Sequence, residues 1–102
     1  MVKTIEPKKV EEKLANSEKL SIIDVRKDEE VAKGMIPGAA HIPLDEIPER
    51  FNEIPKDEEH VMVCRSGGRS GKAAQFLQEK GYSVLNMSGG MLEWNGQTEP
   101  KK

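Results

Sequence analysis

Apolar residues along this chain fall into short continuous runs that are separated by amphipathic or polar stretches. A short apolar run bounded by turn residues is typical of a buried β-strand, whereas apolar residues at steps of three and four are typical of a helix. The runs predict strands at 2–5, 20–25, 40–42, 61–64 and 82–87, with 20–25 buried and central. The other stretches predict helices at 7–15, 26–33, 44–54, 72–80 and 91–94, with the third divided in two near Pro48.

Strands that alternate with helices in this way favour an α/β fold whose parallel sheet is covered on both faces. In such sheets the reactive groups gather at the carboxyl ends of the strands. Asp24 and Cys64 each end a predicted strand, so we expect both at the same edge of the sheet. Asp24 can border a site there or make a structural hydrogen bond to a neighbouring loop, and the sequence leaves both readings open.

The loop that follows the fourth predicted strand consists of small and basic residues, Cys64-Arg65-Ser66-Gly67-Gly68-Arg69-Ser70. Backbone N–H groups at the start of the next helix have no partners within that helix and converge on an anion. With the two arginines, they favour a thiolate and lower the pKa of Cys64. Most free cysteines are small buried apolar residues, but a loop of Arg, Gly and Ser does not pack an interior. We therefore interpret Cys64 as a nucleophile.

Composition narrows the possible functions. The 102 residues predict one domain, which we place at residues 1–97, followed by a flexible tail at 98–102. Basic and acidic residues are mixed along the chain, and the net charge is −2. The sequence contains no basic block with interleaved aromatic residues, so we do not expect a nucleic-acid partner. No apolar run approaches membrane-spanning length. One cysteine cannot form an internal disulfide, and an exposed lone thiol suits a reducing compartment, so we expect a cytoplasmic protein.

The histidines offer no general base for Cys64. His60 precedes the cysteine by four residues, which in an extended strand separates the two by ~13 Å. A Cys-His-Asp triad is therefore not predicted, nor is a structural zinc site. Arg26 and Glu30 are expected to form an ion pair four residues apart, and Met91 and Trp94 are expected in the core.

Several segments occur along the chain in a fixed order: Asp24-Val25-Arg26, Glu30, Gly34-Met35-Ile36-Pro37-Gly38-Ala39, Cys64-Arg65-Ser66-Gly67-Gly68-Arg69-Ser70, and Gly89-Gly90-Met91 with Trp94. Together they resemble a single-domain rhodanese, a member of the thiosulfate sulfurtransferase family, from about Ile5 to Gly96. One departure is Met35, where the family usually carries histidine. That change affects a local polar contact and not the chemistry of the loop.

The resemblance implies a three-layer α/β/α sandwich with a mainly parallel sheet of about five strands. It also implies a sulfurtransferase that moves a sulfane sulfur from thiosulfate or a similar donor to cyanide or a thiol through a persulfide on the catalytic Cys64. The partners implied are small sulfur-containing anions and thiols, or a protein that donates or accepts sulfur, and no cofactor or metal is implied. The expected substrate-binding residues are Arg65, Ser66, Gly67, Gly68, Arg69 and Ser70. Arg69 also opens the predicted helix, which gives it a partly structural role.

Two alternatives compete with sulfur transfer. A cysteine-dependent phosphatase or arsenate reductase also surrounds a thiolate with loop amides, but its loop has five residues between the cysteine and the arginine. Here four residues separate Cys64 from Arg69, and the smaller ring suits a single sulfur atom. A non-catalytic interaction module is the other alternative, although such a domain has no need for both the cysteine and the Arg/Gly loop.

Overall fold

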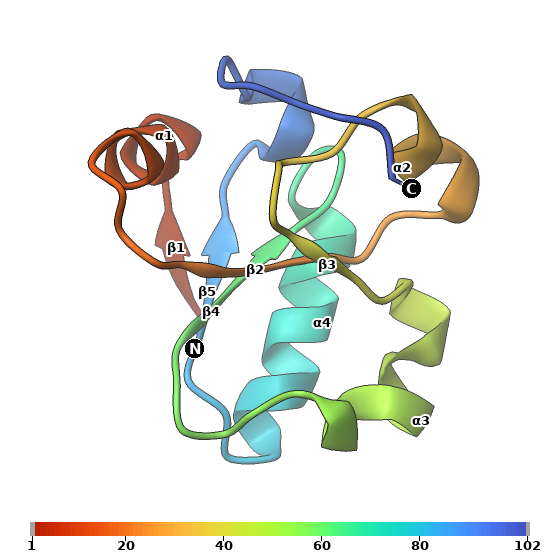
Figure 1. The fold of residues 1–102 in the computed structure, drawn as a ribbon. Coiled ribbons are helices and arrows are strands. Elements are labelled where there is room, and N and C mark those ends of the chain that lie inside the picture. The colour runs from red at the N-terminus through yellow and green to blue at the C-terminus, as the bar shows by residue number, and fades with distance from the viewer. Residues whose placement is uncertain (1, 102) are drawn as a thin grey trace.

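The computed structural model describes residues 2–101. Within them, five parallel strands form one sheet in the order β1-β5-β4-β2-β3 (Figure 1). The strands are β1 (Lys3–Ile5), β2 (Ser21–Asp24), β3 (Ala40–His41), β4 (His60–Val63) and β5 (Val84–Met87). The predicted five-stranded parallel sheet is therefore confirmed. Its middle strand is β4, which carries Cys64 at its end, and β2 lies next to it.

The helices are α1 (Pro7–Ala15), α2 (Asp28–Lys33), α3 (Ile47–Arg50) and α4 (Gly68–Glu79), together with the short 3-10 helices η1 (Leu44–Glu46), η2 (Phe51–Glu53) and η3 (Gly90–Glu93). The segment 44–54 forms three short pieces and not the predicted two, with Pro48 tolerated in the first turn of α3. Helix α4 begins at Gly68, four residues earlier than predicted. Its first turn lacks apolar residues, so the periodicity starts only at Ala73.

Two hydrophobic cores lie on opposite faces of the sheet, because successive side chains of a strand point to opposite faces. On β4, Val61 and Val63 belong to the core under α1. Met62 and Cys64 belong to the core under α3 and α4. The predicted α/β/α sandwich is thus confirmed, and the cysteine side chain points into the α4 layer.

The segment after η3 returns over α2, where the C-terminus lies (Figure 1). Met35 and Glu99 exchange two backbone hydrogen bonds of 2.8 Å, and the Lys101 N–H donates to the Val31 carbonyl. Met35 is itself buried. The domain predicted at residues 1–97 and the flexible tail predicted at 98–102 stay predictions, and Met1 and Lys102 lie outside the described residues.

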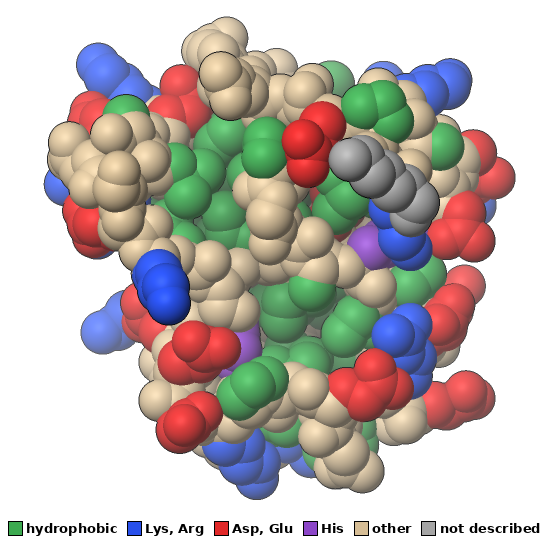
Figure 2. Space-filling model, in the orientation of Figure 1, with side chains coloured by type: hydrophobic (Ala, Val, Ile, Leu, Met, Phe, Trp, Pro, Cys, Tyr) green, Lys and Arg blue, Asp and Glu red, His purple; other side chains and the backbone are tan. Residues whose placement is uncertain are grey.

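The surface is densely charged. Figure 2 shows acidic and basic side chains interspersed over one face, around apolar side chains in its hollows. Among the described residues, no helix has both the length and the apolar character needed to cross a membrane.

Candidate active site

The loop after β4 closes around the Cys64 side chain. The Gly67 N–H donates to the Cys64 Sγ at 3.0 Å, and the Ser70 hydroxyl lies 3.3 Å from the same sulfur. Gly67 precedes α4 with a φ of 101°, a conformation that glycine adopts readily. Cys64 has no exposed surface, so the expected exposed thiol is wrong. Its position one residue past β4 turns it inward, and the loop covers it.

This environment makes the thiol more acidic than an ordinary cysteine. Burial by itself raises the pKa of Cys64. The Ser70 hydroxyl and the backbone N–H groups of Ser70, Gly67 and Ser66 act in the opposite direction and outweigh burial, so the pKa is lowered. The loop therefore favours the thiolate, the nucleophilic form of a cysteine.

A side chain from β5 binds the loop through two hydrogen bonds. The Asn86 Nδ2 group donates to the Gly67 carbonyl oxygen at 3.1 Å, and the Asn86 Oδ1 atom accepts from the Ser70 hydroxyl at 2.5 Å. Sequence reasoning missed Asn86, although an amide within an otherwise apolar strand was a usable signal. Asn86 ties the loop and the first turn of α4 to the sheet.

The turn at residues 88–90, which leads into η3, packs directly against the backbone of residues 64–70, which we call the cysteine loop. The Met91 N–H donates to the Cys64 carbonyl oxygen and the Leu92 N–H to the Arg65 carbonyl oxygen, both at 2.9 Å. Gly90 has a φ of 58°, and a Cβ atom there would lie 2.5 Å from both carbonyl oxygens. Only glycine allows this approach, so Gly90 supports the loop in a way that the sequence did not reveal.

The acidic and basic side chains beside the loop pair differently from the prediction. Glu30 does not pair with Arg26, because Arg69 donates to the two Glu30 carboxylate oxygens at 2.6 and 2.9 Å. The Arg69 hydrogen bond is the main reason that the pKa of Glu30 falls to about 2. Arg26 instead binds the buried Asp24 through its Nε and Nη2 atoms and donates to the Gly34 carbonyl oxygen. Asp24 thus makes a structural contact, to the side chain and the backbone N–H of Arg26.

Arg65 is exposed and differs from the other two arginines. Within residues 2–101 its guanidinium has no hydrogen-bond or ion-pair partner. It lines a cavity of about 520 Å³ whose rim also contains Lys33, Glu30, Met91 and Leu92. Because η3 hydrogen-bonds to the cysteine loop, this cavity lies beside that loop and presents the free Arg65 charge to solvent.

Neither histidine takes part in this site. The His60 Nε2 group donates to the Pro55 carbonyl oxygen, and its Nδ1 atom accepts from the Ser21 hydroxyl, both at 2.6 Å. His60 begins β4, at the opposite end from the thiol. The His41 Nε2 group lies 2.7 Å from the Arg26 carbonyl oxygen. In the part of the chain that the structure describes, no three or more His, Cys, Asp or Glu side chains gather as metal ligands would.

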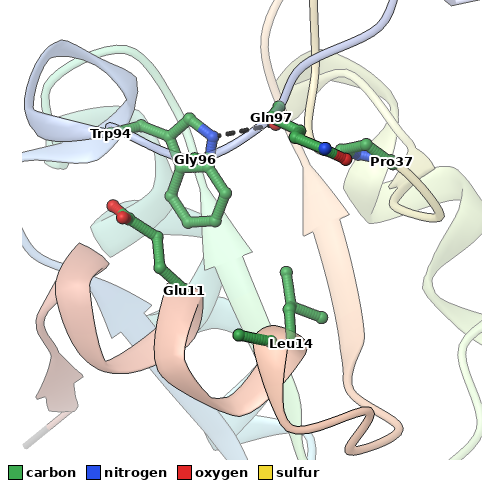
Figure 3. A pocket seen from close by; sticks show the side chains of 7 residues that line it. Glu11, Leu14, Pro37, Trp94, Gly96 and Gln97 are labelled. Atoms are coloured by element: carbon green, nitrogen blue, oxygen red, sulfur yellow. Dashed lines mark hydrogen bonds between the residues drawn. The ribbon is translucent and has the colours of Figure 1, made fainter.

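Another cavity, of about 500 Å³, lies on the α1 side of the molecule (Figure 3). Trp94, partly buried, packs against the core under α1, and its indole N–H donates to the Gln97 carbonyl oxygen at 3.0 Å. Leu14, Glu11 and Pro37 complete the walls. No residue of the cysteine loop lines this cavity. Met91 packs against the same core, so both Met91 and Trp94 lie at the edge of the core, whereas both were predicted inside it.

Comparison with known proteins agrees with this geometry. The model of the family described as "Rhodanese-like domain" matches residues 6–97. The "Putative sulfurtransferase YtwF" of Bacillus subtilis is 47% identical over 100 residues, which cover 98% of this chain and 97% of that protein. A "Sulfurtransferase" of Allochromatium vinosum is 43% identical and covers 92% of this chain and 89% of its own.

A solved structure supports the same assignment. The rhodanese-like domain protein from Staphylococcus aureus superposes with a TM-score of 0.92 at 39% identity, covering 99% of this chain and 100% of that one. Family match, sequence relatives and fold all agree with the order of motifs in the sequence. The chain therefore belongs to the rhodanese-like domain family.

Proposed function

We propose that this protein is a thiosulfate sulfurtransferase that carries a sulfane sulfur as a persulfide on Cys64. The observation that carries the proposal is the placement of the single cysteine of the chain at the focus of the loop amides, with its pKa lowered. The names of the two relatives given above support sulfur transfer, and they leave the donor and the acceptor open.

The reaction proceeds in two displacements. The Cys64 thiolate attacks the outer sulfur of thiosulfate, the S–S bond of the donor breaks, and its electron pair leaves with sulfite. A cyanide ion or a thiolate then attacks the outer sulfur of the persulfide, and the Cys64 thiolate is regenerated. Charge balances at each step without an external oxidant or reductant, and this is covalent catalysis of the ping-pong type.

The loop lowers the energy of both displacements by preorganised dipoles. The N–H group of Gly67 already points at the Cys64 Sγ, and the N–H groups of Ser66 and Ser70 also favour negative charge there. Such a ring acts as an oxyanion hole does, but on a charged sulfur. We assign Arg65, the unpaired guanidinium beside the loop, to the departing sulfite oxygens. Gly68 starts α4 without a side chain, and a Cβ atom there would meet nothing within 4 Å, so the space beside the loop is open.

The loop length distinguishes this function from phosphate chemistry. Four residues lie between Cys64 and Arg69, and the Glu30 carboxylate occupies both terminal nitrogens of Arg69. A phosphate or arsenate group bound inside the loop needs a wider ring with its arginine free, whereas only the outer sulfur of thiosulfate has to enter the ring. A cytoplasmic location stays a prediction from the single free cysteine.

Two variants test the proposal in a thiosulfate:cyanide assay. Cys64→Ser should lose activity by more than about a thousandfold while remaining folded, because a serine hydroxyl is not ionised at neutral pH. Arg65→Ala should raise KM for thiosulfate by about tenfold and change kcat less, because a charge-assisted contact to the donor is lost. Lys9→Ala, on the exposed side of α1, removes one positive charge far from the loop and serves as the control. Sulfur transfer by the folded serine variant would refute the proposal.

A further inference from the structure

Three guanidinium groups lie near the cysteine loop, but two of them are neutralised. Arg26 is held by the buried Asp24 carboxylate. Both terminal nitrogens of Arg69 donate to the Glu30 carboxylate, whose side chain is only 24% exposed. In residues 2–101, only the Arg65 guanidinium beside the loop stays unpaired. The positive charge available to a donor is therefore much smaller than the number of arginines suggests.

Arg69 lies within electrostatic reach of the reacting sulfur. Its pKa is raised, chiefly by the Glu30 hydrogen bonds and to a smaller degree by the charge of Cys64. The two terminal nitrogens of an arginine are also the pair that binds two oxygens of an oxyanion in bidentate geometry. Glu30 thus occupies the face of Arg69 that an anionic donor would use, and it adds a negative charge at the same place.

Glu30 is held in this position from its own helix as well. It lies in the first turn of α2, where its Oε1 atom accepts the Lys27 backbone N–H at 3.1 Å in a capping-box arrangement. The carboxylate is therefore fixed on both sides, by the helix start and by Arg69. A carboxylate anchored in this way cannot swing aside easily when an anion arrives.

We propose that Glu30 sets the donor specificity of the site: by holding Arg69, it makes dianionic donors such as thiosulfate, which the site still accepts, weaker substrates than donors with at most one negative charge, such as thiol persulfides. The inference rests on the proposed sulfur transfer and names its preferred substrate class. Glu30 acts as a positioning residue, since it touches Arg69 and not the reacting atoms. The interaction of a charge with a dianion is twice that with a monoanion, so the discrimination follows from Coulomb's law and is reduced by salt.

The Glu30→Gln variant tests the proposal because glutamine keeps the shape and the cap acceptor but removes the charge. We expect KM for thiosulfate to fall about three- to tenfold at low ionic strength. Because the change in interaction energy is half as large for a monoanion, KM for the persulfide of 2-mercaptoethanol should fall by no more than about the square root of that factor, about two- to threefold. In high salt both effects should shrink. Glu29→Gln, one residue away on the exposed side of α2, changes the net charge equally and should leave both KM values unchanged.

A second measurement does not depend on sulfur transfer. Cys64 is the only cysteine, so its alkylation rates with the anion iodoacetate and the neutral iodoacetamide can be compared. The rate with iodoacetate divided by the rate with iodoacetamide should rise at least about threefold in Glu30→Gln and stay constant in Glu29→Gln. If the unaltered protein forms no persulfide, the proposed function fails, but this ratio still tests the role of Glu30.

A further variant protects the test against a folding defect in Glu30→Gln. Arg69→Lys keeps the positive charge and a pairing partner for Glu30, so KM for thiosulfate should stay unchanged or fall. A rise would mean that the Arg69 guanidinium itself clamps the donor, which overturns the proposal. An unchanged thiosulfate KM in folded Glu30→Gln, or an equal fall in Glu29→Gln, would overturn it as well.

Discussion

The Ser70 hydroxyl has one hydrogen but lies within reach of three acceptors. Asn86 Oδ1 is 2.5 Å away, and Cys64 Sγ and the Gly67 carbonyl oxygen are each 3.3 Å away. While Cys64 is a thiol, the short contact assigns the hydrogen to Asn86. When the thiolate forms, its full charge competes for the same hydrogen, since hydrogen bonds to charged acceptors are the stronger ones. Ser70 is therefore the part of the loop that responds to the charge of the sulfur.

Ser70→Ala should raise the pKa of Cys64, because one of the groups that favour the thiolate is lost. The rate of sulfur transfer should rise with pH as the thiolate forms, so in this variant the acidic limb of the pH profile should move to higher pH. At pH values below the pKa of Cys64, kcat/KM of the variant should be about three- to tenfold lower than that of the unaltered protein, which is the effect of one lost hydrogen bond of ~1 kcal/mol. Ser83→Ala, exposed at the other end of β5, is the control. If the pH profile of the Ser70 variant does not move, the Ser70 hydroxyl does not stabilise the Cys64 thiolate.

Sequence reasoning predicted the residues of the candidate site that are close together along the chain. Cys64 and Arg65 could be interpreted from one continuous loop because strand, turn and helix signals follow each other directly. The Asn86 contact joins positions 16 residues apart, and the Arg69–Glu30 pair joins positions 39 residues apart. Such partners depend on how the strands are ordered in the sheet. The wrong pairing of Arg26 with Glu30 came from favouring the local spacing.

At the scale of elements, the ion pair between Arg69 and Glu30 joins the first turn of α4 to the first turn of α2. The start of α4 could not be predicted from periodicity, because Gly68, Arg69 and Ser70 face the site and contribute no apolar stripe. The strands β2, β4 and β5 were predictable within two residues, since buried parallel strands are continuous apolar runs.

The ion pair between Arg69 and Glu30 should make the free energy of unfolding fall as the pH becomes acidic. The pKa of Glu30 lies near 2 in the folded protein against a usual 4.5, so its contribution is fully present above pH 4.5 and is lost as pH falls toward 2. At neutral pH, Glu30→Gln should lower the free energy of unfolding by about 1 kcal/mol, given partial solvent exposure. Urea titrations of the variant and the unaltered protein should converge as the pH approaches 2. A difference that persists unchanged at that pH would contradict the ion-pair account.

The turn before η3 is the second element that shapes the loop. In Gly90→Ala the new Cβ would press on the Cys64 and Arg65 carbonyl oxygens at a positive φ, so the turn or the loop must shift. We expect a loss of ~1–3 kcal/mol in thermal or denaturant unfolding, together with a lower kcat. Gly38→Ala is the control, because Gly38 also has a positive φ but a Cβ atom there would contact nothing within 4 Å. This variant therefore carries the backbone strain without displacing the cysteine loop. Equal kcat losses in both variants would argue against a specific role for Gly90.

At the scale of the whole molecule, the parallel sheet brings together segments that lie far apart in the sequence. The ends of β2 and β4, the start of α4 and the turn after β5 meet at one edge, where the cysteine loop forms (Figure 1). Alternation along β4 turns Cys64 into the α4 core, which explains its burial. The α/β class followed from the alternation of strands and helices, and the burial did not, because a loop of polar residues suggested exposure.

Sulfur loading of Cys64 is the direct test of persulfide chemistry in this protein. The unaltered protein is incubated with thiosulfate, and its intact mass is measured before and after addition of cyanide. We expect a gain of one sulfur atom on Cys64, its removal by cyanide, and no gain in Cys64→Ser. A protein that keeps its original mass with thiosulfate, and that hydrolyses an aryl phosphate instead, would contradict this expectation.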